Sequence, residues 1–278
     1  MAAQEISLTA AARSNLLSLQ GTAKLIGRTQ ERLATGLRVN SALDDAQAFF
    51  QARALSNRAS DLATVKDGIN QGVSALKATV QAIEAITALV EQVRGLAQAA
   101  KSEATDTQGT SNRSSFALQA RNLATQINNL VNDASYQGIN LLASVPSNLE
   151  VNFNETSAVE LSITGTTLHA GALSISTTTG DFATNTDINV DLTKLDSALS
   201  TLRTEAARFG ANNTLLVTRL DFTNKFVNTL NEGAGKLTLA DLNEESANLL
   251  ALQTRQQLAI NSLGLAAQAE QSVLSLFG

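Results

Sequence analysis

The stretch from residue 192 to residue 230 constrains the fold of this chain more than any other part of the sequence. A series of positions along it advances by alternating steps of three and four residues, and ten of its twelve members are apolar. A 3.5-residue period held over this length predicts a helix of a left-handed coiled coil, roughly 58 Å long at 1.5 Å per residue. We expect its polar member Asn213 to fix the register, and Gly233 and Gly235 to end the helix. The series is Leu192, Leu195, Leu199, Leu202, Ala206, Phe209, Asn213, Leu216, Leu220, Thr223, Val227 and Leu230.

Helical periodicity also covers most of the remaining chain. Apolar residues recur at steps of three and four, Ala and Leu favour helices, and the chain contains one Pro, the residue that breaks helices most strongly. Gly36 is expected to stop the first helix. The predicted helices cover residues 6–37, 46–101, 116–134 and 239–277, with a turn at 105–115 between the second and the third.

Residues 143–189 follow a different pattern. Apolar and polar residues alternate around Leu149 and Val151, around Leu161 and Ile163, and again at Leu173 and Ile175, with Gly between the runs, which predicts β-hairpins. We therefore predict a mainly α fold: long antiparallel helices and a coiled coil formed by both chain ends, with a small β-hairpin insert in the middle. The predicted domains are an inner terminal-helix core of residues 1–40 with 236–278, an outer coiled-coil core of 41–142 with 190–235, and the insert at 143–189.

The composition argues against several classes of function. The chain has no Cys and a single His, so thiolate nucleophiles, disulfides and thiolate metal sites are excluded, and His169 has no second His to share a metal or a catalytic proton. A net charge of −5 with scattered basic residues offers no patch for nucleic acid. No apolar run approaches the roughly 18 residues of a membrane helix. We predict no catalytic, metal or cofactor site, and a surface or packing role for His169.

Two short motifs resemble chemical sites but favour structural roles. Asp44 and Asp45 form a pair of carboxylates near an expected helix start, where a capping or ion-pair role is favoured. Residues 233–236, Gly-Ala-Gly-Lys, lack the first Gly and the following Ser or Thr of a phosphate-binding loop, and they follow a helix rather than a strand. We interpret them as a helix-ending turn.

Both predicted terminal helices are nearly uncharged and apolar on more than one face. From residue 246 to the last residue, Arg255 and Glu270 are the only charged residues. A helix that is apolar all round must be buried, so we expect neighbouring copies of the same chain to cover these ends and to order them on assembly. Packing of the ends on the chain's own middle, as in an ordinary helical bundle, is the alternative. The candidate self-assembly residues are Leu8, Leu16, Leu19, Ile26, Leu33, Leu263, Val273, Leu276 and Phe277.

Three motifs, in the correct order, resemble the bacterial flagellins. Residues 33–46, LATGLRVNSALDDA, resemble the N-terminal signature LSSGLRINSAKDDAA, with Leu43 in place of the usual Lys. Residues 136–142, YQGINLL, resemble the YNGxxLL element. The tail from 253 to 277 resembles the flagellin C-terminus, and residues 240–245, ADLNEE, resemble the alphaproteobacterial variety. The resemblance spans about 145 residues at the front of the chain and about 85 at the back.

This resemblance implies a self-polymerising subunit of the flagellar filament that serves swimming motility. It implies terminal helices paired in an inner tube, coiled-coil helices in an outer tube, and the variable middle on the surface. The chain would be exported through the flagellum's own channel to the extracellular filament. No cleaved signal peptide is expected, since no basic patch precedes an apolar core at the start. The implied partners are other flagellin copies, a flagellar secretion chaperone, the cap and the hook–filament junction proteins, with no cofactor, nucleic acid or membrane insertion.

One element of the family differs in this chain. Many flagellins carry QRVRELA where a vertebrate innate immune receptor docks, and residues 91–97 here are EQVRGLA. Arg94 and Leu96 match, but Gln92 replaces an Arg and Gly95 replaces a Glu. Because Gln cannot make the charged, bidentate contacts of Arg, we expect weak or absent recognition.

Other functions remain as alternatives. A hook–filament junction protein of the same superfamily would share the terminal helices but occur in a few copies per flagellum. A cytoplasmic coiled-coil signalling protein, such as a chemoreceptor fragment, should be rich in charge along its helix flanks, and 16% charged residues is too few. An enzyme is disfavoured because the chain has no nucleophile motif and a single His.

Overall fold

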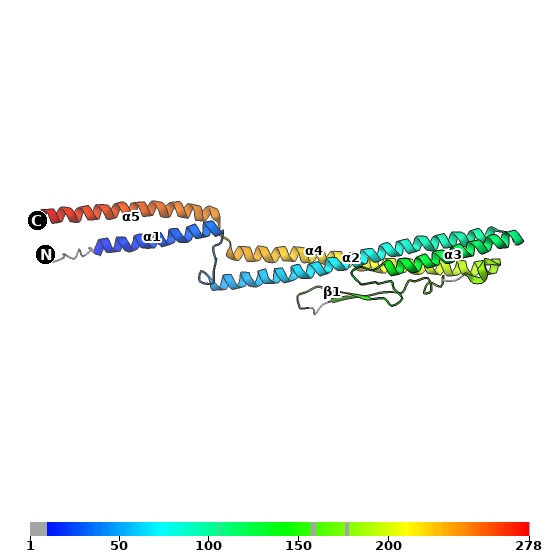
Figure 1. Cartoon of the computed structure of the whole chain (residues 1–278). Helices are drawn as coiled ribbons and strands as arrows, with labels where there is room; N and C mark the ends of the chain where they lie inside the picture. Colours follow the sequence, from blue (N-terminus) through cyan, green and yellow to red (C-terminus); the bar gives the residue numbers. More distant parts are fainter. Residues whose placement is uncertain (1–9, 105, 157–159, 176–177, 278) are drawn as a thin grey trace. The chain divides into compact units, whose positions relative to one another are not determined.

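The computed structural model describes residues 10–104, 106–156, 160–175 and 178–277. These residues form a mainly helical fold with one small hairpin, as predicted (Figure 1). The elements, in chain order, are α1 (Ala10–Thr35), α2 (Ala46–Ser102), α3 (Thr107–Asp133), β1 (Asn148–Asn152), β2 (Glu160–Thr164), the short 3-10 element η1 (Thr179–Phe182), α4 (Asn185–Thr238) and α5 (Leu242–Phe277).

The chain folds into two compact units. The terminal unit comprises residues 1–57 with 229–278, so it contains α1, α5, the first turns of α2 and the last turns of α4. The central unit comprises residues 58–228, with the rest of α2 and α4 together with α3 and the hairpin.

A single apolar core holds the central unit together. α2 contributes Ile69, Leu76 and Ile83, and α3 contributes Ala120 and Ile127, all fully or almost fully buried. All twelve members of the predicted series in α4 are buried or half-buried, which confirms the predicted period. Apolar burial of this kind is the main favourable term in folding.

The polar member of that series keeps an unpaired atom. Asn213 is half-buried, and its Oδ1 is buried without a hydrogen-bond partner in the described part of the chain. Its role in fixing the register stays a prediction.

α2 combines the length and hydropathy that a membrane span requires. Its most apolar 18-residue window has a mean hydropathy of 1.4, and 44% of that window is buried inside the structure. A core helix passes the same test, so one such helix is weak evidence for a membrane span.

The hairpin packs one face onto the helices. β1 and β2 pair antiparallel, with Leu149 opposite Ile163 and Val151 opposite Leu161. The side chains of Leu149, Val151 and Ile163 are buried, as the alternation predicts. A Cβ added to Gly72 of α2 would lie 2.8 Å from Val151 Cγ2 and 3.1 Å from Leu216 Cδ1, so only Gly lets the hairpin, α2 and α4 meet here.

A third strand at Leu173 and Ile175 is not formed. Both side chains are buried, but the backbone folds into turns, with Ser174 at φ +59°. The Ile175 amide donates to the Ala170 carbonyl at 2.9 Å, so local turn bonds replace a ladder. Alternating burial therefore arose here without a strand. Val159, which alternates with Leu161 and Ile163 in the sequence, lies outside the described residues.

The prediction that Gly233 and Gly235 end the helix is wrong, because both lie inside α4, which continues to Thr238. A Gly inside a helix costs about 1 kcal/mol relative to Ala. The helix continues because its last carbonyls are bound by the chain after α1. The Arg38 and Val39 amides both donate to the Thr238 carbonyl, at 2.7 and 3.2 Å. Tertiary hydrogen bonds thus outweigh the local glycine cost.

The predicted turn at 105–115 is wrong in extent, because α3 already begins at Thr107. Asp106 caps this helix by accepting from the Gly109 amide at 2.8 Å. A Cβ on Gly109 would lie 2.0 Å from the Ala104 carbonyl oxygen, so this position requires Gly for the close approach.

α4 also begins earlier than the periodicity indicates. The Asp187 amide donates to Thr184 Oγ1 at 3.2 Å, and the Thr184 amide donates to Asp187 Oδ2 at 3.1 Å. This reciprocal pair is a capping box, which starts α4 at Asn185.

Candidate self-association surface on the terminal helices

α1 and α5 lie side by side and pack along each other (Figure 1). Each helix presents one stripe to its partner, with members spaced three or four residues apart, as knobs-into-holes packing requires. We call these two stripes the α1–α5 seam. It consists of Leu16, Leu19, Thr22, Ile26, Thr29 and Leu33 of α1 and Leu249, Leu252, Gln256, Ala259, Leu263 and Ala266 of α5, all buried or half-buried.

The candidate self-assembly residues fall mainly on this seam. The structure brings Leu16, Leu19, Ile26, Leu33 and Leu263 together there, each half-buried within a single copy of the chain. Leu8 lies outside the described residues, and α5 includes Val273, Leu276 and Phe277 but their side chains are not described.

A second set of leucines points away from the seam. At about 100° per residue, Leu17 of α1 and Leu250, Leu258 and Leu265 of α5 lie roughly 130° away from their own seam, and Leu25 lies on the flank of the α1 seam. We call these five leucines the outer face. Their exposed fractions are 69% and 44% on α1, and 67%, 64% and 68% on α5. Exposed apolar clusters of this kind mark interaction surfaces.

The two linkers beside this helix pair are bound to each other. Gly36 ends α1 at φ +70°, a conformation that favours Gly, as predicted from the sequence. Its carbonyl accepts from the Ala240 amide at 3.0 Å, and Leu37 and Leu239 form an antiparallel bridge. Together with the bonds to Thr238, these contacts form a joint made largely of main-chain atoms.

The two acidic residues of the first linker both accept hydrogen bonds from backbone amides. Asp45 accepts from the Ala48 amide at 3.0 Å and so caps α2. Asp44 Oδ2 accepts from the amides of Asn40 and Ser41, at 3.2 and 3.0 Å, and from the Ser41 hydroxyl. The predicted capping role is confirmed for Asp45, whereas Asp44 binds amides of the linker and caps no helix.

Acid is expected to loosen the linker through Asp44. The backbone hydrogen bond from Ser41, its largest cause, lowers the pKa of Asp44 below its ordinary value of 3.8. The stabilisation is therefore complete above pH 3.8 and is lost as the pH falls through the lowered pKa. NMR of the Ser41 amide should show this titration in the wild type. An equal titration in Asp44→Asn, which cannot ionise, would contradict the assignment.

An ion pair joins α1 and α5 near the linkers, where α1 ends and α5 begins. Arg32 Nη1 donates to Glu245 Oε1 at 2.8 Å, and the side-chain exposures are 30% and 10%. Glu245 is in the first turn of α5, where its charge also favours the helix dipole. Sequence reasoning missed this pair, because its partners are 213 residues apart.

Two sequence regions match known family patterns. The bacterial flagellin N-terminal helical region matches residues 6–146, and the bacterial flagellin C-terminal helical region matches residues 192–277. The chain belongs to the flagellin family. This is a structural protein family, and flagellins form the extracellular flagellar filament.

Curated flagellins match over the whole chain. Flagellin FljO of Caulobacter vibrioides is 31% identical over 280 residues, covering 100% of both chains. A flagellin of Brucella melitensis is 28% identical over 282 residues, covering 98% of each. The crystal structure of Bacillus cereus flagellin is 19% identical, covers 56% of this chain and 88% of its own, and gives a TM-score of 0.48.

The residues expected from the family resemblance to correspond to a receptor site are divided between two faces of α2. Gln92, Gly95 and Leu96 line an open groove with residues of α3, and no atom lies within 4 Å of a Cβ added to Gly95. Arg94 instead pairs with Asp196 of α4, with 3.2 Å between Nε and Oδ1. The structure therefore does not bring Arg94 together with Gln92 and Leu96.

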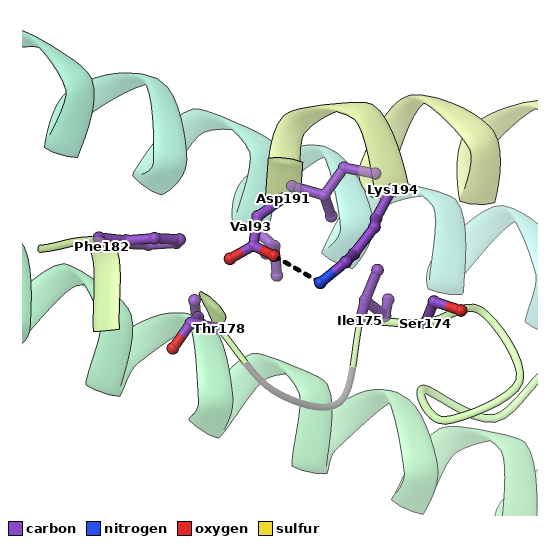
Figure 2. A pocket seen from close by; sticks show the side chains of 9 residues that line it. Val93, Ser174, Ile175, Thr178, Phe182, Asp191 and Lys194 are labelled. Atoms are coloured by element: carbon purple, nitrogen blue, oxygen red, sulfur yellow. Dashed lines mark hydrogen bonds and ion pairs between the residues drawn. The ribbon is translucent and has the colours of Figure 1, made fainter. Parts of the chain in front are cut away.

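A buried carboxylate anchors the second half of the insert in this flagellin. Asp191, 5% exposed, accepts from the amide and the hydroxyl of Thr179, both at 2.6 Å, and from Lys194 Nζ at 2.9 Å. Figure 2 shows Asp191 between Phe182 and Lys194, and Phe182 is 1% exposed although its backbone has φ +61°. The pocket they line has room for about one water molecule, too little for a substrate.

His169 has a local structural contact. Its Nδ1 accepts from the Ala172 amide at 2.9 Å and so stabilises a turn of the insert. Among the described residues, no group of three or more His, Cys, Asp or Glu side chains is placed to hold a metal ion.

Proposed function

We propose that this chain polymerises with copies of itself into the helical tube of the flagellar filament and thereby serves swimming motility. The observation that supports this most directly is the outer face, five leucines of α1 and α5 that are 44% to 69% exposed in a single copy. Burying apolar surface contributes roughly 25 cal/mol per Å², so covering these exposed leucines with another copy favours association.

The charge pattern supports the same conclusion. Between residues 246 and 269 of α5, Arg255 is the one charged residue. A helix that faced water on its outer side would be expected to carry a solvated, charged stripe there. A contact between the α5 leucines of one copy and the α1 leucines of the next joins two different surfaces, and a head-to-tail contact of this kind, repeated, gives an open helical polymer.

The inner and outer division of the chain belongs to this proposal. In it, residues 1–40 with 236–278 line the inner tube, residues 41–142 with 190–235 form the outer tube, and the insert at 143–189 faces solvent. The further partners, by family resemblance, are a secretion chaperone, the cap and the hook–filament junction proteins.

Electron microscopy of the purified chain, seeded with filament fragments at moderate salt, tests this function. We expect long tubes of regular helical symmetry whose central channel is lined by α1 and α5. Soluble chains that never elongate, with terminal helices resistant to protease, would support packing of the ends within one copy. A hook–filament junction protein, the second candidate, would be present in only a few copies in sheared filaments.

We also propose that the receptor-equivalent region is recognised weakly. Gln92 lacks the guanidinium of the family's Arg, and Arg94 is engaged by Asp196. A reporter-cell assay should give little response to the wild type, and Gln92→Arg with Gly95→Glu should raise it, because position 95 has open space for a side chain. A wild-type response as strong as that to a standard enteric flagellin would refute the proposal.

A further inference from the structure

α5 has two apolar faces of similar strength. Its seam face carries Leu249, Leu252 and Leu263, and the opposite face carries Leu250, Leu258 and Leu265. Three leucines thus compete with three leucines for the contact with α1. Hydrophobic attraction is non-directional, so it does not decide which face turns inward.

The backbone joint leaves this choice open. The Ala240 amide bonds to the Gly36 carbonyl just before α5 begins, and this bond fixes where the helix starts. It involves no side chain of α5. Rotation of the helix about its own axis therefore needs another determinant.

The structure assigns that role to the ion pair of Arg32 and Glu245: we propose that it selects the face of α5 that packs on α1, and so selects the face left for neighbouring copies. Glu245 precedes Leu249 by four residues, one helical turn, and so lies on the seam face. A charged hydrogen bond of 2.8 Å is directional, unlike the leucine contacts. Only the part of this inference that concerns neighbouring copies rests on the proposed function; the choice of the face that packs on α1 does not.

The alternative rotation would leave the two charges badly placed. Half a turn of α5 would carry the Glu245 carboxylate away from Arg32 and bring the apolar opposite face to the guanidinium. Arg32 would then be partly buried without its partner, which strongly disfavours the rotated state. Polar contacts in otherwise apolar interfaces are best known for fixing register and orientation in this way.

The test uses charge reversal and exchange in the full chain. Arg32→Glu and Glu245→Arg each replace attraction by repulsion, and the double variant exchanges the two charges. The matched control is Glu232→Arg, which breaks the exposed pair of Glu232 with Lys236 within α4. Because the chain has no Cys, spin labels can be placed on cysteines introduced at the exposed positions Lys24 and Gln257.

Two readouts are taken: seeded elongation, and the label-to-label distance in filaments diluted with unlabelled chain. We expect each single reversal to slow elongation at least about tenfold and to add a distance population shifted by up to about 10 Å, the width of a helix. The double variant with exchanged charges should recover most of the wild-type elongation rate and of the wild-type distance distribution. Glu232→Arg should match the wild type in both readouts.

The outcomes separate this inference from the proposed function. If the wild type and both single variants elongate alike with one shared distance, the ion pair selects nothing and the inference fails. If the wild type does not elongate at all, the proposed function fails, and the distances in the unassembled chain decide the inference. Equal distances in the wild type and Glu245→Arg would then overturn it.

Discussion

Replacing Leu258 and Leu265 together by Asp is expected to abolish seeded elongation while the chain itself stays folded. Both side chains are more than 60% exposed in one copy, at 64% and 68%, so the new carboxylates remain in water there. In a filament that covers the outer face they would be buried, at a cost of several kcal/mol for each ion. Electron microscopy and far-UV circular dichroism would measure assembly and helix content.

The control is Leu118→Asp, a similar change at a side chain of α3 that is 55% exposed. It should leave elongation in place if α1 and α5 carry the contact. Leu263→Asp provides a second comparison, because Leu263 lies on the seam and its substitution should also lower helix content. Normal filaments from the Leu258 and Leu265 variant would show that the outer face is not the assembly surface.

Replacing Arg113 by Ala is expected to destabilise the central unit by about 3 kcal/mol or more. The guanidinium is 1% exposed and ties together three helix ends. It donates to the Glu103 carbonyl at the end of α2 at 2.7 Å, to the Ala183 carbonyl at 3.1 Å, and to Asn185 Oδ1 at the start of α4 at 2.9 Å. Its removal deletes all three of these hydrogen bonds and leaves a cavity where the buried side chain had packed.

Urea unfolding followed by tyrosine fluorescence can measure this change in the free energy of unfolding. Tyr136 is the single tyrosine and lies in the central unit, where its hydroxyl donates to Gln71 Oε1 at 2.8 Å. Arg121→Ala is the matched control on the same helix, because Arg121 is 40% exposed and forms a surface ion pair with Asp181. That pair should contribute about 0–1 kcal/mol. An equal effect of the two substitutions would show that Arg113 is not a structural anchor.

Sequence periodicity was sufficient for the helices and the hairpin because both depend on local spacing. The buried series of α4 and the inward Leu149 and Val151 follow directly from periods of 3.5 and 2. The end of α4 was missed because it is set by Arg38 and Val39, nearly 200 residues earlier in the chain. Local propensity contains no information on such distant hydrogen bonds.

The candidate site was predicted in part. The sequence predicted that α5 is apolar on several faces, and in the structure leucines lie both on the seam and on the exposed side of this helix. It did not show which face meets α1, so the predicted residues Leu19 and Leu263 lie on the seam while Leu258 and Leu265 remain exposed. The predicted turn at 105–115 includes Arg113, which the structure instead places in α3. In both cases the sequence did not show which elements pack against each other. The periodicity of one segment shows that it has an apolar face but not which segment covers that face.

The joint between the linkers has a mechanical consequence. Thr238 and Gly36 accept amides from the opposite linker, so the chain segments leaving α1 and entering α5 are cross-connected before they reach the long helices. A pull on α1 is therefore transmitted to α4 through the hydrogen bonds as well as to α2 through the covalent chain. Several main-chain hydrogen bonds of the joint must break together before either terminal helix can be pulled away alone. Tension on a terminal helix is therefore shared between α2 and α4, whereas a linker without these bonds would stretch.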